Sequence, residues 1–552
     1  MIARPDCSPS AWECSRGCNV SATGISELRR YVLQRRWTLV MILCSAVYTA
    51  QAVHFAPLLY PSSMGAQHLL VGSLAVKGQL SLYDDRLYGN RAPLPFYVLG
   101  ITQLWGPSFR AARWVNIGFG VLTLLLTAFL ARRLAGEEAG ILAAAFLVTQ
   151  GTVVAYYSSE HYFAFGAFCV AAGLLALLWG DSPRHRVLGM TIIGLLFFVR
   201  TNLWPAIPFL LGYSLWQARR TLERVLLVTV VVLPPLIFFA WDVRHLKLLA
   251  YVPVVRHLVA PLGYISLVQS GDEAWPLGRH LLEFGRFGRR YEFWVLAALI
   301  LLVYAVWRAA TNKPWSVLGR NPKARLLALL FIFLLPIQFV VDPNSWIPAT
   351  AYFLLFAPIV PILLGIGFSG LLVEFPAGCR SRWVLVVVLS LLFVLPMYFV
   401  RNPFYPLTLG DRVIFTPLES VERAAEKLSR AVPHDSKVFF YGWNVVYYLS
   451  GLPPTYLTQV YESGILGSLA ADEFTLRKSG FVPVRDMAYW LSADADYAVV
   501  VRGFPPGFLS WDHLQITETF ATLLDIHFDK IGSVENEYPY FEYGIYRRKS
   551  RS

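Results

Sequence analysis

The stretch AGILAAAFLVTQGTVVAYYSSEH, residues 139–161, decides the class of fold to which this chain belongs. Its first 19 residues, 139–157, carry no charged side chain. As an α-helix, a run of that length spans about 28 Å, close to the roughly 30 Å hydrocarbon core of a bilayer. The run ends in Glu160 and His161, so it predicts a membrane span that brings a carboxylate to the membrane surface.

The whole chain has the same character. Its 552 residues are 56% hydrophobic and only 15% charged, and the mean hydropathy is +0.50, which is too apolar for a soluble protein with one ordinary core. Apolar runs long enough to cross a bilayer begin near Trp37, Ala111, Ala139, Tyr162, Val187, Trp204, Val225, Phe293, Leu326, Ala351 and Trp383. We therefore expect an α-helical polytopic membrane protein with about eleven transmembrane helices.

Short basic loops predict the orientation, because Lys and Arg resist translocation and gather on the cytoplasmic side. Basic clusters fall on alternate loops: Arg29, Arg30, Arg35 and Arg36; Arg132 and Arg133; Arg184 and Arg186; Arg219, Arg220 and Arg224; Lys313, Arg320, Lys323 and Arg325; Arg380 and Arg382. This pattern predicts a plasma (inner) membrane protein with a cytoplasmic tail at 1–36 and a transmembrane domain at 37–401. Outer loops are expected at 57–107 and 242–291, and an extracytoplasmic domain at 402–552.

The net charge of +13 is unevenly distributed. Residues 1–401 hold 34 Lys and Arg against 17 Asp and Glu, whereas residues 402–552 hold 14 against 18. Because topology accounts for much of the basic excess, the charge does not indicate a nucleic-acid partner. The outer segment 242–291 also carries many cations, which favours either an anionic ligand or a solvated basic loop near lipid headgroups.

Residues 402–552 read as a small α/β domain, in which amphipathic helices alternate with short apolar strands. We expect helices at 418–431, 445–449 and 484–491, and strands at 438–441, 498–501 and 543–547. The alternation favours a Rossmann-like sheet. No Gly-rich phosphate loop accompanies it, so we interpret the domain as a cap over an outer cavity and not as a dinucleotide site.

Two acidic positions stand out on the predicted outer side. Asp84 and Asp85 lie in the loop between two short interfacial helices expected within 57–107, and Glu160 ends the third apolar run. Charge at a membrane surface is costly and usually serves chemistry or ion handling. The alternative for Asp84 and Asp85 is a solvated pair near Arg86.

The order of these features resembles the lipid-linked-sugar glycosyltransferases of the GT-C superfold, in particular bacterial relatives of protein O-mannosyltransferases and of aminoarabinose transferases. The matching residues are Leu82-Tyr83-Asp84-Asp85, Pro93-Leu94-Pro95-Phe96-Tyr97, Leu104-Trp105-Gly106, Ala111-Ala112-Arg113, Glu160, Phe198-Val199-Arg200-Thr201-Asn202, Ala351-Tyr352-Phe353-Leu354, Asp494-Ala495-Asp496-Tyr497 and Tyr546-Arg547-Arg548. The resemblance covers nearly the whole chain. One feature departs from it: the family places an acid just after the first span, but Leu58 to Gly65 contains no carboxylate.

The resemblance implies transfer of a sugar from a polyprenyl-phosphate donor. The acceptor hydroxyl then needs a carboxylate base, for which Asp85 and Glu160 are the candidates, with Asp84 as their neighbour. The departing phosphate needs fixed positive charge. Arg200, at the outer end of an apolar run, is the first candidate, although it could equally snorkel to headgroups; Arg91 and Arg113 are further candidates.

No cofactor or metal set is evident in the sequence. His161 beside Glu160 would allow a divalent cation, but one adjacent pair is weak ligand evidence and a plain interfacial histidine is the simpler interpretation.

Taken together with the resemblance, these residues predict a glycosyltransferase that acts on a polyprenyl-phosphate sugar at the outer face of the membrane, with an unidentified protein, lipid or glycan acceptor. Two alternatives stay open: a non-catalytic relative that binds lipid-linked sugars, and a transporter or flippase of such lipids, which would favour ionisable residues at mid-span and related halves.

Overall fold

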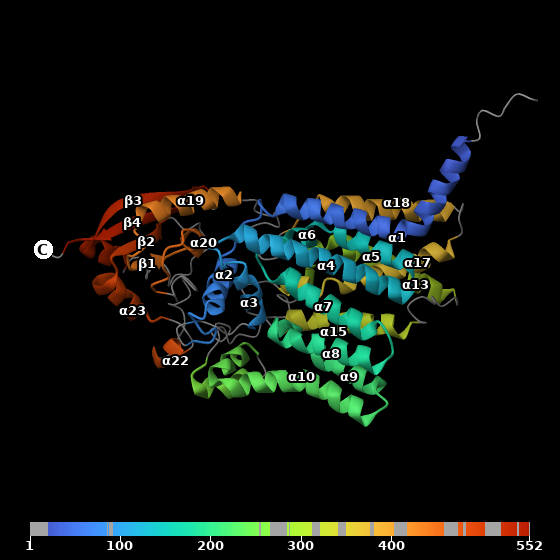
Figure 1. Ribbon diagram of the computed structural model, residues 1–552, viewed down its shortest axis with the longest axis horizontal. Coiled ribbons are helices and arrows are strands. Elements are labelled where there is room, and N and C mark those ends of the chain that lie inside the picture. The colour runs from blue at the N-terminus through green and yellow to red at the C-terminus, as the bar shows by residue number, and fades with distance from the viewer. Residues whose placement is uncertain are drawn as a thin grey trace, which may run out of the picture.

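The structure is a computed structural model, and it describes residues 20–84, 87, 92–252, 255–264, 284–285, 287–311, 321–340, 349–375, 380–401, 417–456, 473–478, 482–502, 520–537 and 540–550. Most of its helices run along the long axis of an elongated molecule, and a small sheet domain lies at one end (Figure 1). The bundle consists of α1 (Val20–Phe55), α4 (Phe109–Ala135), α5 (Glu137–Val148), α6 (Gly151–Tyr157), α7 (Phe163–Leu178), α8 (Pro183–Leu195), α9 (Ala206–Gln217), α10 (Thr221–Trp241), α13 (Glu292–Ala310), α15 (Pro322–Val340), α17 (Ile359–Glu374) and α18 (Arg380–Val394). Shorter turns connect them: η1 (Leu196–Phe198), η2 (Thr201–Leu203), η3 (Val243–Tyr251), α11 (Arg256–Val259), η4 (Ala260–Leu262), α16 (Ala349–Tyr352), η6 (Phe353–Leu355) and η7 (Leu395–Met397).

The bundle has the composition of a membrane domain. Among the described residues, five helices are long and apolar enough to cross a bilayer: Arg35–Phe55, Phe109–Ala135, Thr221–Trp241, Glu292–Ala310 and Arg380–Met397. The apolar run at 139–157 forms two helices, α5 and α6, which meet at an angle of 72°. Each of the eleven expected runs coincides with a helix or begins next to one, so the protein is a multi-pass membrane protein. Among the described residues, five helices are long and apolar enough to cross a bilayer, or six if α5 and α6 form one bent span, whereas about eleven spans were expected.

Small residues allow the central helices to approach closely. A Cβ atom built on Gly365 of α17 would lie 2.5 Å from the carbonyl oxygen of Ala139 on α5 and 3.0 Å from the Cβ of Ala143. No side chain larger than hydrogen fits at that position. Close backbone approach of this kind is a common source of helix association in membranes, where apolar burial supplies little driving force.

The two short helices expected within 57–107 are α2 (Ser63–Val76) and α3 (Leu94–Ile101). They lie between the bundle and the sheet domain (Figure 1). Their backbones touch through two glycines, because a Cβ on Gly100 would lie 2.3 Å from the backbone of Gly72. This pair of helices frames the loop that carries the acidic residues 84 and 85.

The C-terminal domain contains a four-stranded sheet in the order β1-β2-β4-β3, built from β1 (Val438–Tyr441), β2 (Tyr497–Arg502), β3 (Phe528–Glu537) and β4 (Tyr540–Arg548). The helices of the domain are α19 (Leu418–Ala431), α20 (Asn444–Leu449), α22 (Glu473–Lys478), α23 (Val484–Tyr489), the π-turn η9 (Trp490–Asp494) and a helix at 520–527. The expected helices and strands are present, but strand β3 was missed. The expectation of a Rossmann-like sheet is wrong: β1 and β2 are parallel, whereas β2–β4 and β3–β4 are antiparallel. The tight connection from β3 to β4 makes a hairpin, which cannot be parallel.

The sheet domain is joined to the bundle at the loop that follows α1. The Leu418 amide donates to the Pro57 carbonyl at 2.8 Å, and the Tyr60 ring stacks on Trp443 with centroids 5.1 Å apart. From α4, Arg110 makes a two-point ion pair with Glu422 of α19. These contacts hold the sheet domain over the end of the bundle where Glu160 lies.

Candidate functional site

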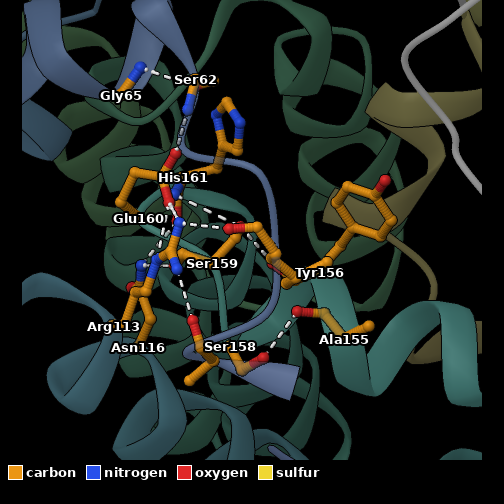
Figure 2. A network of polar contacts seen from close by, with 12 residues as sticks. Ser62, Gly65, Arg113, Asn116, Ala155, Tyr156, Ser158, Ser159, Glu160 and His161 are labelled. Atoms are coloured by element: carbon orange, nitrogen blue, oxygen red, sulfur yellow. Dashed lines mark hydrogen bonds and ion pairs between the residues drawn. The ribbon is translucent and has the colours of Figure 1, made fainter. Parts of the chain in front are cut away.

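Glu160 is fully buried in an ion pair with Arg113 of α4. One carboxylate oxygen, Oε2, accepts from Nε and Nη2 of Arg113 at 2.9 and 2.8 Å. The other, Oε1, accepts from the backbone N–H of Ser62 at 2.7 Å. Arg113 also donates to the carbonyls of Leu59, at 3.0 Å, and Ala56. Figure 2 shows how this pair ties α4, the turn after α6 and the loop after α1 together.

The local sequence leaves room for the Glu160 side chain. Ser62 caps α2 by accepting from the Gly65 amide at 2.8 Å, and a Cβ on Gly65 would lie only 2.3 Å from Cγ of Glu160. Asn116, one turn beyond Arg113, donates from Nδ2 to the carbonyls of Ser159 and His161 at 2.6 and 2.7 Å. The packing therefore brings a carboxylate from residue 160 to the loop 58–65, which contains none of its own.

Arg200 lies in a second buried polar cluster. Its Nη2 donates to the Tyr352 hydroxyl at 2.8 Å and its Nε to Asn202 Oδ1 at 3.3 Å. The guanidinium lies over the rings of Tyr352 and Tyr162, at 5.0 and 5.5 Å from their centroids. Because Tyr162 is two residues beyond Glu160, the turn 160–162 joins the Arg113–Glu160 pair to Arg200.

Asp84 directly follows Ser81, Leu82 and Tyr83, which line a cavity of about 770 Å³. The cavity is lined by Ser81, Leu82, Tyr83, Pro93, Tyr97, Phe198, Leu233, Pro234, Ile237, Phe238, Trp241, Asp242, Arg244 and His245. Tyr83 directly precedes Asp84, and its ring contacts Phe238 and His245 with centroids 5.7 and 4.9 Å away. Asp85 and Arg91, both predicted as site residues, lie outside the described residues.

Asp242, the acidic residue in the cavity lining, is already paired. Arg244 binds Asp242 at 2.6 Å, and hydrogen bonds from this guanidinium hold the pKa of the Asp242 carboxyl below its usual value. At neutral pH the pair is therefore ionised and locally neutral, which makes Asp242 a poor proton acceptor.

Several polar residues of these clusters were not singled out from the sequence. His68 of α2 stacks on Phe96 with centroids 4.6 Å apart and contacts the Tyr162 ring at 5.3 Å. Tyr352, which the resemblance includes only as part of the stretch 351–354, accepts a hydrogen bond from Arg200. Asn116 could have been predicted as a site residue, because a side-chain amide within an apolar run needs a specific hydrogen-bond partner. In the part of the chain that the structure describes, no group of three or more His, Cys, Asp or Glu side chains could hold a metal ion.

No protein-family model matches the sequence, and no curated protein matches it. The structure is similar to that of ArnT from Cupriavidus metallidurans bound to undecaprenyl phosphate, with a TM-score of 0.56 and 14% identity over 93% of this chain and 98% of that chain. The apo state of ArnT gives a TM-score of 0.55 at the same identity and coverage. The oligosaccharyltransferase of Archaeoglobus fulgidus, tethered with an acceptor peptide, gives 0.48 and 12% identity over 94% of this chain and 75% of that chain. The similarity to ArnT spans almost the whole of both chains, so this chain has a GT-C fold with a C-terminal sheet domain.

Proposed function

On the premise of a GT-C fold, we propose that the protein is an integral membrane glycosyltransferase. It transfers a sugar from a polyprenyl-phosphate donor to an acceptor at the extracytoplasmic face of the membrane. One observation carries the proposal: the 770 Å³ cavity is bordered by Tyr83, Pro93 and Phe198. These three residues lie next to, or two positions from, Asp84, Arg91 and Arg200.

The chemistry assigns a role to each charge. A polyprenyl phosphate leaves without being protonated, so the reaction needs a base for the acceptor hydroxyl and fixed positive charge for the phosphate. We assign the base to the Asp84–Asp85 pair, with Asp85 first, and the phosphate to Arg200 assisted by Arg91. The wall formed by Leu233, Ile237 and Trp241 of α10 is exposed on the apolar outside of the bundle, which suits the isoprenoid part of the donor.

Glu160 is the other candidate base, and the structure constrains that role. Both of its oxygens already accept hydrogen bonds from the protein, and the residue has 0% exposure. To accept a proton from an acceptor, the buried carboxylate would first have to become accessible to it. We therefore assign to Glu160 and Arg113 the positioning of the turn 158–162, from which Tyr162 reaches Arg200.

Donor binding without transfer is the second candidate function. It is favoured by the loop 58–65, where the resemblance expects an acid. Within the described residues, the carboxylate that reaches this loop is that of Glu160, and Arg113 neutralises it. Purified protein that binds a polyprenyl-phosphate sugar but never releases polyprenyl phosphate would select this function.

The test is a transfer assay on purified full-length protein in lipid nanodiscs with radiolabelled polyprenyl-phosphate sugars. We expect Asp85→Asn to lower kcat by about 10²-fold or more, the usual contribution of a general base, without changing donor affinity. Arg200→Met should instead weaken donor binding. Matched controls are Asp435→Asn, in the loop before β1, and Arg423→Met, on α19. Wild-type turnover that survives both Asp85→Asn and Glu160→Gln would remove the site assignment.

A further inference from the structure

Lys247 is a buried cation whose ammonium group points toward the acidic loop. It belongs to the basic outer segment 242–291, yet the residue is only 2% exposed. Its Nζ donates to the main-chain carbonyl of Asp84 at 2.9 Å and to that of Leu87 at 3.5 Å. A buried ammonium is costly unless its donors are satisfied. These carbonyls satisfy two of them, so this cation serves the protein's own main chain.

The segment around Lys247 also holds the loop by packing. Phe238 and His245 stack with centroids 4.0 Å apart and an interplanar angle of 6°, and Tyr83 contacts both rings edge-on. Within the loop, the Asp84 amide donates to Ser81 at 3.1 Å, and the Leu87 amide donates to Asp84 at 3.0 Å. The carbonyl of Asp84 therefore accepts from both the Leu87 amide and the Lys247 ammonium group.

The C-terminal domain meets this segment at the Tyr264 ring. The Tyr264 ring lies 5.9 Å from Nζ of Lys247 and 5.5 Å from Nζ of Lys478, which ends α22. A cation at this distance from an aromatic face is attracted to it. Tyr264 thus faces one lysine that reaches the acidic loop and another that belongs to the sheet domain.

We propose that Lys247 is a positioning residue for the transfer reaction: it fixes the main chain at Asp84 and at Leu87, on either side of Asp85 in the sequence, and so limits the movement of the acidic residues. The inference rests on the proposed function. Lys247 thus has a structural role, whereas the charge of segment 242–291 suggests either an anionic ligand or a solvated loop. The two hydrogen bonds of Lys247 to main-chain carbonyls act on the backbone of the acidic loop, so its effect on the reaction passes through the acids.

The experiment compares three variants of the full chain in nanodiscs. Lys247→Met removes the donors but keeps most of the unbranched side chain, and Lys247→Gln keeps an uncharged donor. Lys478→Met is the control, because Lys478 lies over the same ring. We expect Lys247→Met to lower kcat by about 10- to 100-fold, the effect of losing a charged hydrogen bond. The donor KM should stay unchanged, Lys247→Gln should be intermediate, and Lys478→Met should match wild type.

Hydrogen exchange gives a second measurement that needs no turnover. The amide protons of residues 80–87 should exchange about 10-fold faster or more in Lys247→Met, because the turn has lost a charged hydrogen bond. Unchanged exchange in that segment would overturn the inference, as would a variant that raises KM alone, since a donor ligand would then be lost and not a positioning residue. If wild-type protein shows no turnover, the proposed function fails, and the exchange result still decides the role of Lys247.

Discussion

The Arg113–Glu160 ion pair gives the most quantitative prediction of this structure, because α4 carries a second pair for comparison. Arg110, one turn earlier, makes a two-point ion pair with Glu422. The two pairs differ in exposure: the side chains are 1% and 0% exposed for Arg113 and Glu160, but 58% and 31% exposed for Arg110 and Glu422. The perturbation is the same for both pairs, a Glu→Gln substitution.

The expected costs follow from burial. Removing one partner of a buried pair leaves an uncompensated charge and costs about 3–5 kcal/mol, whereas an exposed pair contributes about 0–1 kcal/mol. Glutamine cannot reproduce the contacts of Glu160, because the carboxylate accepts at both oxygens. In Glu160→Gln the amide NH₂ would face either the Ser62 N–H or the Arg113 guanidinium, which are both donors.

The assay is reversible unfolding in mixed micelles, with the free energy of unfolding taken from the tryptophan fluorescence of the 17 Trp residues. Glu160→Gln should cost at least about 2 kcal/mol more than Glu422→Gln, the smallest difference between the two ranges. Equal costs would refute the reasoning, since burial would then not decide the strength of the pair. Adding Arg113→Met to Glu160→Gln should cost less than the sum of the two single effects, because the unpaired charge is removed.

Three further outcomes are expected. Gly65→Ala should destabilise the protein and lower transfer activity, because the new methyl group would displace Glu160, whereas Gly118→Ala on α4, with open space around it, should be neutral or slightly stabilising; equal effects in thermal unfolding and transfer assays would contradict this. Hydrogen bonds from Lys437 and Tyr456 hold the pKa of Asp494 below its usual value, so its contribution to stability should be present at neutral pH and lost as the pH falls through the folded pKa; the stability difference between wild type and Asp494→Asn should therefore vanish in acid, and a difference that persists would contradict this. Trp443→Ala should loosen the contact between the sheet domain and the loop after α1, seen as faster hydrogen exchange at residues 57–62, and unchanged exchange there would argue against a role for the Tyr60 stack.

Local pattern predicted the elements that depend only on neighbouring residues. The helix expected at 418–431 and the strand expected at 438–441 match α19 and β1, because amphipathic periodicity and short apolar runs are local properties. Strand β3 was missed, since Phe528–Glu537 reads FDKIGSVENE and has no apolar alternation. It lies at one edge of the sheet, where charged side chains are tolerated and even favoured.

In the candidate site, too, the sequence predicts single residues but not the residues that they contact. Glu160 could be singled out because a carboxylate at the end of an apolar run is costly. Its partner Arg113 is 47 residues away, and Lys247 is 163 residues from the carbonyl it binds. No rule based on sequence spacing predicts contacts between positions so far apart. The sequence therefore suggested an anionic ligand or solvent, and not the main chain of the protein, as the partner of the cations in segment 242–291.

Hydropathy and charge along the chain were enough to predict a helical membrane protein, the positions of its apolar helices, and the acids and cations at the ends of those helices. Length, hydropathy and charge act residue by residue, so they can be read without knowing the fold. The contacts between distant charged and polar groups depend on the tertiary structure. Glu160 is buried in an ion pair with Arg113, Arg200 lies over the rings of Tyr162 and Tyr352, and Lys247 binds the main chain of the acidic loop. The physical reason is that ion pairs and hydrogen bonds act over a few ångströms, and the packing of helices alone determines which distant residues come within that distance.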